Sequence, residues 1–270
     1  MKEIKSYKKN LLKKIFVKLC RILGFEIVDQ SNFSVPTSKK SLDQIISQPG
    51  KDSVTFPLGQ IKITRTVKSL DIILRTCMSV NMLTQSKKRI FEREKDEYTI
   101  RSLRSIIKSV NYAKQTFSNT KFKIFVIDYN SKKNQIEILE NELKKSNINF
   151  EIINLDFKKF SSQIKNLNQE NKEVTVNQKS NMSNIHQSLL LSKEKSKDLT
   201  YFVEDDYIHE KNSLLEMLFT YEKISSLINK ELIICPTDYP FLYTKAEGTR
   251  IFLGQNIHWR QIDQTLCTFL

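Results

Sequence analysis

The chain contains 270 residues, of which 27% are charged, 39% hydrophobic and 10% aromatic. This composition is too apolar for a disordered chain and too polar for a membrane bundle, so it predicts a folded protein with one large or two small domains. No uncharged apolar stretch reaches the roughly 18 residues of a membrane-spanning helix, and the start of the chain lacks the apolar core and cleavage site of a signal peptide. We therefore expect a cytoplasmic protein.

The four cysteines lie far apart and include no CxxC pair: Cys20, Cys77, Cys235 and Cys267. Their spacing excludes a disulfide framework and a zinc cluster made of cysteines. We expect them to be buried apolar residues.

The chain carries 44 basic and 30 acidic residues, a net charge of +14. Such an excess indicates an anionic partner, and nucleic acid, an acidic lipid surface and a phosphorylated substrate all stay open. The chain is also rich in Lys, Ile and Asn, as a genome biased toward A and T would make it, so part of the excess needs no partner. Half of the excess is local, because residues 1–25 hold eight basic side chains against the single acidic Glu3.

Residues 1–25 are predicted to form a basic amphipathic helix that stops at Gly24. Its apolar side chains recur at steps of three and four and share one face: Leu11, Leu12, Ile15, Phe16, Leu19, Ile22 and Leu23. The opposite face is basic: Lys13, Lys14, Lys18 and Arg21. Such a helix suits the surface of an anionic membrane, where each basic residue contributes roughly 1 kcal/mol, and it equally suits packing on the rest of the protein.

Residues 26–66 are predicted to be a linker. Their Ser, Asn, Pro and Gly content is typical of extended chain, with one short helical turn around 42–46. The main domain is then expected to span 67–270. Because Leu270 closes an apolar run, QTLCTFL, we expect this domain to be truncated at its C-terminus.

Short β-rich apolar runs alternate with segments of helical periodicity after residue 66, which predicts an α/β fold. The runs cover residues 69–76, 122–128, 150–156, 199–206 and 231–238. Their continuous apolar character indicates strands that are buried on both faces of a mostly parallel sheet.

Three helices are predicted from apolar residues at helical spacing: Ile100 to Val110, Ile136 to Leu143 and Leu214 to Ile228. Ser213 and Glu216 offer a capping box for the third of them. Residues 158–183 are rich in polar side chains and are predicted to form a mobile surface loop before a fourth helix over 182–197.

Polar side chains gather where the predicted strands end: Arg75, Thr76, Asp128, Asn130, Glu204, Asp205, Asp206 and Asp238. Parallel sheets bind ligands at the carboxyl ends of their strands, so four strand ends are expected to converge on one crevice. Neither a P-loop motif nor a GxGxxG motif occurs, which removes the main support for those two classes of nucleotide site.

Glu204, Asp205 and Asp206 follow a strand that is otherwise apolar. Three adjacent carboxylates repel one another, so they are costly at a strand end without a compensating cation. A divalent metal such as Mn²⁺ or Mg²⁺ provides this compensation and bridges one or two carboxylates to a diphosphate. A solvated acidic turn before a helix is the alternative explanation of the same residues.

The order of these elements resembles the nucleotide-binding half of GT-A-type glycosyltransferases, and family-2-like members in particular. The resemblance covers about residues 69–240 and runs through LDIILRT, FKIFVIDYNSKKNQIEIL, FEIINLD and FVEDDY. It implies a GT-A-like fold, with a Rossmann-like, mostly parallel sheet flanked by helices, and a nucleotide-diphosphate sugar as donor. Each motif is short, so the resemblance lies in their order and in their position at strand ends.

The resemblance also implies roles for individual residues. Arg75 and Thr76 would lie beside the donor nucleotide, and Asp128, which matches the first aspartate of the VDDGS pattern, would contact its base. Asp205 would contact the ribose, and Asp206 would bind Mn²⁺ or Mg²⁺ as the last residue of a DxD-like motif.

The chain departs from the family pattern at several positions. Tyr129 replaces the second aspartate of VDDGS, Asn130 replaces its glycine, and Glu204 opens the acidic motif. A long insertion over 77–98 stands where a compact loop and helix would be usual.

An inverting transfer needs a carboxylate base for the acceptor hydroxyl. Asp238 in CPTDYP is the first candidate and Asp263 the second, although an aspartate near a proline is also a common turn residue. His258 is a candidate metal or phosphate ligand, with Trp259 as a platform for the sugar and Arg260 as a phosphate partner. A purely structural His–Trp pair is the alternative.

The expected function is therefore metal-dependent transfer of a sugar from a nucleotide-diphosphate donor to a cell-surface glycan or lipid-linked acceptor. The transfer would take place at the inner face of the membrane. A basic nucleic-acid-binding protein is a second hypothesis, which rests on the net charge and lacks a recognisable binding motif. A catalytically silent interaction module on the same scaffold is a third.

Overall fold

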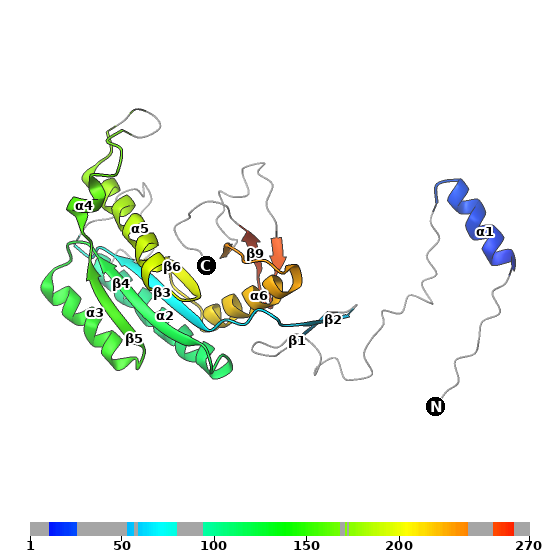
Figure 1. The fold of residues 1–270 in the computed structure, drawn as a ribbon, viewed down its shortest axis with the longest axis horizontal. Helices are drawn as coiled ribbons and strands as arrows, with labels where there is room; N and C mark the ends of the chain where they lie inside the picture. Colours follow the sequence, from blue (N-terminus) through cyan, green and yellow to red (C-terminus); the bar gives the residue numbers. More distant parts are fainter. Residues whose placement is uncertain are drawn as a thin grey trace.

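The computed structural model describes residues 11–25, 53–56, 59–79, 94–167, 171, 173–236 and 251–261 (Figure 1). The helices are α1 (Leu11–Ile22), α2 (Lys95–Thr116), α3 (Lys133–Lys145), α4 (Phe157–Ser161), α5 (Val176–Lys195) and α6 (Ser213–Ile228). The strands are β1 (Ser53–Phe56), β2 (Gly59–Lys62), β3 (Ser69–Thr76), β4 (Lys121–Asp128), β5 (Asn149–Asn154), β6 (Leu199–Glu204), β7 (Ile234–Pro236), β8 (Ile251–Leu253) and β9 (His258–Gln261).

The central sheet consists of four parallel strands in the order β5-β4-β3-β6 (Figure 1). This confirms the predicted α/β class, with a parallel sheet flanked by helices. Four of the five predicted apolar runs form these strands, with ends close to those expected from the sequence. The order corresponds to 3-2-1-4 along the chain, which is the arrangement of a Rossmann-like half.

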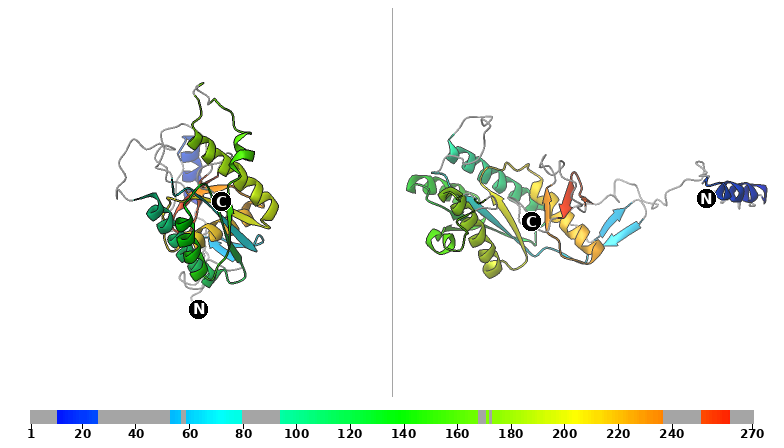
Figure 2. Two further views of the ribbon diagram at one scale, coloured as in Figure 1. Left: turned by 90° about the vertical axis from the view of Figure 1, so that its left-hand side faces the viewer. Right: turned by 90° about the horizontal axis from the view of Figure 1, so that it is seen from above.

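Alternate side chains of the central strands enter two separate hydrophobic clusters. Ile72 and Ile124 belong to the larger cluster, together with the apolar faces of α2, α3 and α6. Ile73 and Phe125 belong to the smaller cluster, together with side chains of α4 and α5 such as Leu191. Because successive side chains of a strand point to opposite faces, α2 and α3 cover one face of the sheet and α4 and α5 the other (Figure 2). Burial on both faces explains the continuous apolar character of the runs.

Helix α5 begins earlier than predicted, at Val176, inside the segment expected to be a mobile loop. Thr175 caps it, because its hydroxyl accepts from the Gln178 N–H and the Gln178 side chain accepts from the Thr175 N–H. The face that α5 buries is made mainly of small polar residues: Ser180, Ser183, Asn184 and Ser188. Apolar periodicity therefore missed the first part of this helix, as it missed the short α4.

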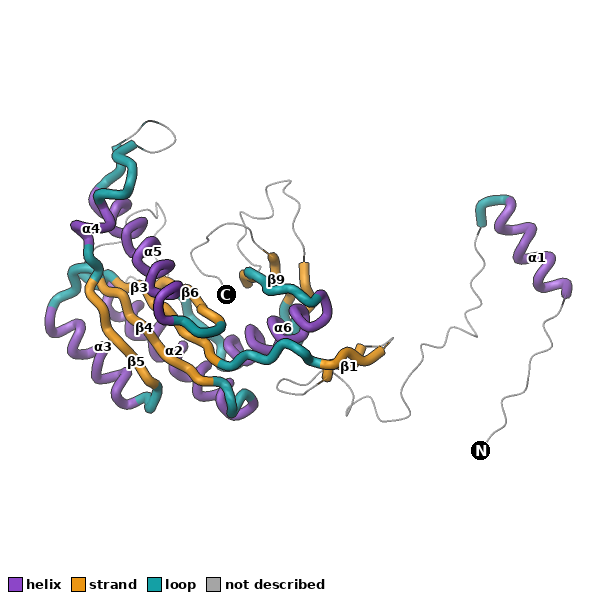
Figure 3. The backbone as a smooth tube through the Cα atoms, viewed as in Figure 1, coloured by secondary structure: helices purple, strands orange, loops and turns teal. Residues whose placement is uncertain are grey.

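The fifth apolar run does not join the parallel sheet, contrary to the prediction. Its strand β7 pairs antiparallel with β9 in a separate three-stranded sheet of order β7-β9-β8, which lies beside α6 (Figure 3). Leu232 and Ile234 are buried whereas Glu231 and Ile233 are exposed, the alternation of a strand with one covered face. The sheet that carries the candidate site thus receives four strands rather than five.

The predicted capping box of Ser213 and Glu216 does not form at the start of α6. Glu216 binds the turn between β8 and β9 instead. Asn212 is the N-cap, and the Glu216 carboxylate instead accepts from the backbone N–H groups of Gln255 and Asn256 at 2.6 and 3.1 Å. The Asn256 side-chain amide donates to the same carboxylate at 3.1 Å. Glu216 is buried, so these three donors replace the water that its charge would otherwise need. The turn thereby fixes the start of β9.

The chain entering β3 is already packed. Ile63 and Val67 belong to the larger cluster, and the guanidinium of Arg65 pairs with Asp198 at 2.5 Å and Glu231 at 2.8 Å. Within the predicted linker, the short strands β1 and β2 pair antiparallel. The helical turn predicted around 42–46 lies outside the described residues.

Helix α1 exposes its apolar residues. The exposed fractions run from 54% at Ile15 to 75% at Ile22, and Phe16, Leu19 and Leu23 lie between these values. No other described element lies beside this helix in Figure 1. Among the described helices, none is both long and apolar enough to span a bilayer.

Of the three described cysteines, which were all expected to be buried, only one is buried. Cys235 is buried in the smaller cluster, whereas Cys20 and Cys77 are partly exposed. None of these three forms a disulfide with another described cysteine. Cys267 lies outside the described residues.

Candidate functional site

The strand order of the central sheet reverses between β3 and β6. The chain leaves β3 through α2 and then α3 on one face, and it reaches β6 through α4 and α5 on the other (Figure 1). In open α/β sheets the crevice outside the carboxyl ends of such strands is the usual ligand site. Thr76 and Cys77 lie at the end of β3, and Glu204, Asp205 and Asp206 lie at the end of β6.

Arg75 and Glu204 form an ion pair across the two central strands. They are register partners in the parallel ladder, and one Nη of Arg75 lies 3.1 Å from Glu204 Oε1. The Arg75 side chain is only 6% exposed. Arg75, predicted to lie beside the donor nucleotide, therefore supplies the positive charge next to the first carboxylate of the acidic motif.

Asp205 is bonded to three groups of the chain. The Lys95 ammonium lies 2.5 Å from its Oδ1, and its Oδ2 accepts from the Thr99 hydroxyl at 2.8 Å and the Cys77 N–H at 3.3 Å. The Asp205 side chain is 8% exposed and that of Lys95 is 13% exposed. One buried carboxylate thus connects the end of β6, the end of β3 and the first turn of α2.

These two ion pairs compensate part of the negative charge of the acidic motif. Three adjacent carboxylates were expected to need a divalent metal, but Arg75 pairs with Glu204 and Lys95 with Asp205. Within the described part of the chain, no three His, Cys, Asp or Glu side chains gather as a potential metal site. Asp206 is partly exposed at the next position. A single carboxylate fits Mg²⁺ or Mn²⁺ only when substrate phosphates supply further ligands.

Asp128 and Thr76 come together at the ends of neighbouring strands, as predicted. They are register partners, and the Thr76 hydroxyl donates to Asp128 Oδ1 at 2.7 Å. The Ser131 hydroxyl donates to the same oxygen at 2.6 Å, and the Ser131 N–H donates to Oδ2 at 3.0 Å. Asp128 is 3% exposed, so its carboxylate organises the turn after β4.

The turn after β4 also explains one departure from the VDDGS pattern. Asn130 has a φ of 58°, in the left-handed region that glycine adopts freely and that asparagine tolerates better than most residues. Asparagine can therefore occupy the position of the family's glycine without changing the path of the backbone. Tyr129, which replaces the second aspartate, packs against Phe157 with ring centroids 5.1 Å apart.

The residues around His258 do not form the predicted sugar platform. Trp259 is 1% exposed and belongs to the larger core cluster, so its ring is not accessible to a sugar. His258 is partly exposed at the start of β9, which belongs to a different sheet from β6, the strand that precedes Asp206. Asp238 and Asp263 lie outside the described residues, as does the side chain of Arg260.

Sequence reasoning missed Lys95, Thr99 and Ser131. Ser131 belongs to the VIDYNS segment and could have been found as the residue that closes the turn after Asp128. Lys95 and Thr99 lie one helical turn apart in or next to the apparent insertion, and their shared partner is more than a hundred residues away. No local pattern reveals such a contact.

His209 packs between α2 and the segment that follows the acidic motif. Its ring Nε2 lies 2.8 Å from the Tyr201 hydroxyl and its ring Nδ1 lies 3.4 Å from the Ser105 hydroxyl. The backbone N–H of His209 donates to the same Ser105 hydroxyl at 2.9 Å. Burial lowers the pKa of His209 to about 4, so the ring is neutral at physiological pH. It ties α2 to the segment that follows the acidic motif.

No protein-family model and no curated protein sequence matches the chain. Two solved structures of LgtC are similar to it: an active-site mutant at 10% identity, and the galactosyltransferase in complex with donor and acceptor sugar analogues at 9% identity. Each covers 71% of this chain with a TM-score of 0.31, and the chain spans 56% and 57% of their lengths. The α/β class of this chain rests on its own sheet, not on this likeness.

Proposed function

We propose that this protein is a glycosyltransferase that moves a sugar from a nucleotide-diphosphate donor to an acceptor hydroxyl. The observation that carries the proposal is the position of the two acidic motifs. Asp128 is the last residue of β4 and Asp205 follows β6, on either side of β3, at the carboxyl edge where the strand order reverses. The order and strand-end position of these motifs are those that resemble the GT-A nucleotide-binding half.

The carboxylates of the site divide into structural and ligand-binding groups in this proposal. Asp128 and Asp205 hold the strand ends and the first turn of α2, so they shape the donor site more than they line it. Asp206, the partly exposed last residue of the DxD-like motif, is the residue that would bind Mn²⁺ or Mg²⁺ together with the donor diphosphate. When bound, the ion offsets the negative charge that develops on the leaving diphosphate.

The transfer step follows from the chemistry of the donor. The acceptor oxygen attacks the anomeric carbon, the bond from that carbon to the diphosphate oxygen breaks, and the hydroxyl proton passes to a base. Asp238 remains the proposed base if the transfer inverts the anomeric centre. The proposed acceptor is a cell-surface glycan or a lipid-linked glycan at the inner membrane face, since α1 exposes apolar side chains on a basic segment.

A catalytically silent scaffold is a second candidate. The observation that favours it is that Glu204 and Asp205 already have cationic partners from the chain itself. A silent scaffold would bind the nucleotide without breaking the bond between sugar and diphosphate. Donor hydrolysis or transfer therefore separates the two candidates.

The decisive experiment measures binding of nucleoside diphosphates and of their sugar conjugates by calorimetry, with Mn²⁺ and with a chelator. We expect binding that requires the metal and that weakens by about tenfold or more in Asp206→Ala. Glu210→Gln is a matched control, because Glu210 is exposed a few residues further along the same segment. Equal binding in the chelator would contradict the metal site, and failure of every nucleotide to bind would contradict the proposed function.

A further inference from the structure

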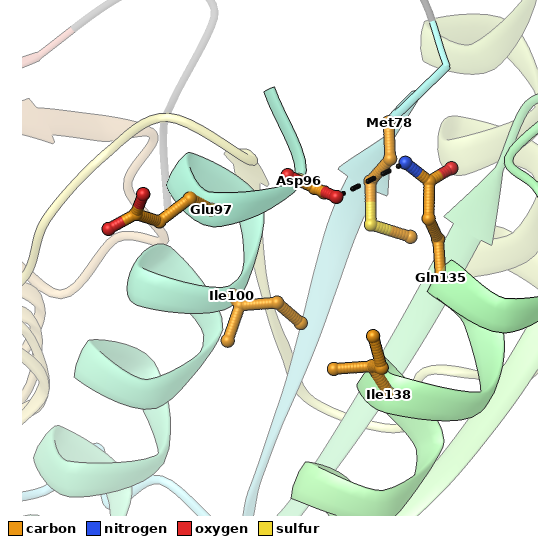
Figure 4. Close-up of a pocket in the computed structure, with 6 residues that line it drawn as sticks. All are labelled: Met78, Asp96, Glu97, Ile100, Gln135 and Ile138. Atoms are coloured by element: carbon orange, nitrogen blue, oxygen red, sulfur yellow. Dashed lines mark hydrogen bonds between the residues drawn. The ribbon is translucent and has the colours of Figure 1, made fainter. Parts of the chain in front are cut away.

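A cavity of about 170 Å³ lies between the first turns of α2 and α3 and the turn that follows β3 (Figure 4). Its lining combines apolar and polar side chains: Met78, Asp96, Glu97, Ile100, Gln135 and Ile138. None of these residues belongs to the acidic motifs described above. The cavity is therefore a separate feature at the same edge of the sheet.

The first turn of α2 lies between this cavity and the carboxylate of Asp205 at the end of β6. Lys95 and Thr99 bond to Asp205, whereas Asp96 and Ile100, each one residue further on, line the cavity. A side chain and its neighbour four residues later lie on the same helical face, so the two pairs occupy adjacent faces of one turn. A ligand that spans one helical turn can thus contact both the cavity and the acidic motif at the end of β6.

The turn after β3 connects the cavity to the donor motifs as well. Cys77 donates its N–H to Asp205, and the next residue, Met78, donates its N–H to the Ser131 hydroxyl at 2.9 Å. Ser131 in turn donates to Asp128. The side chain of Met78 lines the cavity while its backbone belongs to this chain of hydrogen bonds, so the two sites share one rigid boundary.

The size and apolar walls of the cavity suit one flat six-membered ring. Ile100 of α2 and Ile138 of α3 approach each other from opposite sides, with Met78 above them (Figure 4). A protein cavity of about 150 Å³ binds benzene, so a volume of about 170 Å³ accommodates a single ring more readily than a fused pair. The thioether of methionine adapts to such a ring and contacts its face favourably.

Two polar groups at the cavity are arranged to read the edge of a ring. The side-chain oxygen of Gln135 accepts from the Lys132 N–H at 3.0 Å and lies 3.2 Å from the Ser79 hydroxyl, which directs its NH₂ group toward Asp96. The contact from that NH₂ group to Asp96 Oδ2 is long, at 3.4 Å. An amide donor beside a carboxylate acceptor complements a ring edge that presents an acceptor next to a donor.

We propose that this cavity binds the base of a pyrimidine nucleotide, with Asp96 and Gln135 recognising its hydrogen-bonding edge. The inference rests on the proposed function, because base and diphosphate belong to the same donor. The diphosphate lies in the crevice beside Asp206 and the base lies across the first turn of α2. Asp128, whose carboxylate is bonded to Thr76 and Ser131, supports the wall of the cavity and does not read the base.

The test compares four ligands on the full chain with Mn²⁺ present, namely UDP, CDP, GDP and ADP, and uses inorganic pyrophosphate as a ligand without a base. We expect the pyrimidine diphosphates to bind about tenfold more tightly than the purine diphosphates. Gln135→Ala should weaken UDP and CDP by a similar factor and leave pyrophosphate unchanged. Ile138→Lys should do the same by filling the mouth of the cavity, and Ile138 is 48% exposed, so the fold should tolerate the change.

Asn134→Ala and Glu137→Gln are the matched controls, because both residues are exposed on α3 beside the two test positions. If all four nucleotides bind equally and the cavity variants bind them as the wild type does, the base site is wrong while the proposed function stands. If no nucleotide binds the wild type, both proposals fail. Selective weakening of the pyrimidine nucleotides in both cavity variants, with pyrophosphate binding retained, supports the base site.

Discussion

Asp205 and Asp206 are neighbours in the sequence but have different surroundings. Asp205 is buried and bonded to Lys95, Thr99 and the Cys77 N–H, whereas Asp206 is partly exposed. Removing one partner of a buried ion pair leaves the other charge without compensation, which is more costly than losing an exposed carboxylate. Stability and ligand binding should therefore depend on different members of the pair.

We predict that Asp205→Ala lowers the free energy of unfolding by about 3 kcal/mol, because Lys95 then keeps a buried charge without its carboxylate. Asp206→Ala should change it by less than about 0.5 kcal/mol. Urea unfolding at pH 7.5 measures both values. Similar losses in the two variants would show that the ion pair does not hold the end of β6 to α2.

His209 gives the protein a defined dependence on pH. Its pKa is about 4 in the folded state, below the ordinary value of 6.5, because burial disfavours the charged ring. The unfolded chain then binds more protons between these two values, so the stabilisation is complete above pH 6.5 and is lost as the pH falls toward 4. The loss attributable to this ring is up to about 3 kcal/mol.

The measurement compares wild type with His209→Gln by urea unfolding at pH 7.5 and pH 5. The difference between the two proteins should change with pH, because the variant cannot titrate at this position. The comparison is necessary since burial also raises the pKa of Glu222 to about 7, which gives a dependence of the opposite sign. A constant difference at both pH values would mean that the His209 ring is not held neutral by burial.

At the scale of elements, the turn between β8 and β9 depends on the absence of a side chain at Gly254. A Cβ at this position would lie 2.2 Å from Glu216 Oε1 and 2.6 Å from the backbone oxygen of Ile257. The second contact is to backbone and cannot be relieved by a rotation of a side chain. Close packing here thus fixes how the β7-β9-β8 sheet meets α6.

We predict that Gly254→Ala lowers the free energy of unfolding by about 2 kcal/mol, within the range for an overpacked site. Leu253→Ala is the control, since Leu253 is 74% exposed and its truncation should cost less than about 0.5 kcal/mol. Thermal and urea unfolding provide the two measurements. If the two variants are equally stable, the turn is free to shift away from Glu216.

The elements differ in how far sequence patterns could predict them. Strands β3, β4 and β6 were predicted because both of their faces are buried, and β5 because its partly buried apolar residues contact both clusters. Helices α2, α3 and α6 were predicted because apolar residues recur along one face. The start of α5 was not predicted, because its buried face is made of small polar residues: Ser180, Ser183, Asn184 and Ser188. Asn184 donates to the Ile127 carbonyl at 3.0 Å, so this helix is attached to the sheet by a polar contact that periodicity does not register.

At the scale of the whole molecule, charge and apolar exposure are unevenly distributed. The segment 1–25 supplies half of the net charge of +14, and helix α1 within it exposes Ile15, Phe16, Leu19 and Ile22. By contrast, several cations of the α/β part, such as Arg75 and Lys95, pair with carboxylates at the site. About half of the excess charge thus lies in a segment outside the candidate site, and the exposed apolar residues beside it favour a membrane surface over nucleic acid as the partner of this segment.

We predict that deletion of residues 1–25 abolishes binding to vesicles that contain anionic lipid, measured by co-sedimentation. Nucleotide binding by the remaining chain should be unchanged. The double change Phe16→Ser and Leu19→Ser keeps every charge and should also weaken vesicle binding, because the apolar face provides the insertion. Unchanged sedimentation after the deletion would mean that α1 is not a membrane-binding element.

The sequence by itself determined the order of the four strands β3 to β6 and of helices α2, α3 and α6, the α/β class, and the position of Asp128 and Asp205 at strand ends. These features follow from local patterns, since burial on one or both faces sets the spacing of apolar residues within each element. Only the tertiary structure decided that Lys95 and Arg75 compensate the carboxylates, that Trp259 is buried, that the fifth strand joins another sheet and that a cavity opens between α2 and α3. Each of these depends on contacts between residues far apart in the chain, which arise from how the elements pack together and leave no mark on the spacing of residues within any one element.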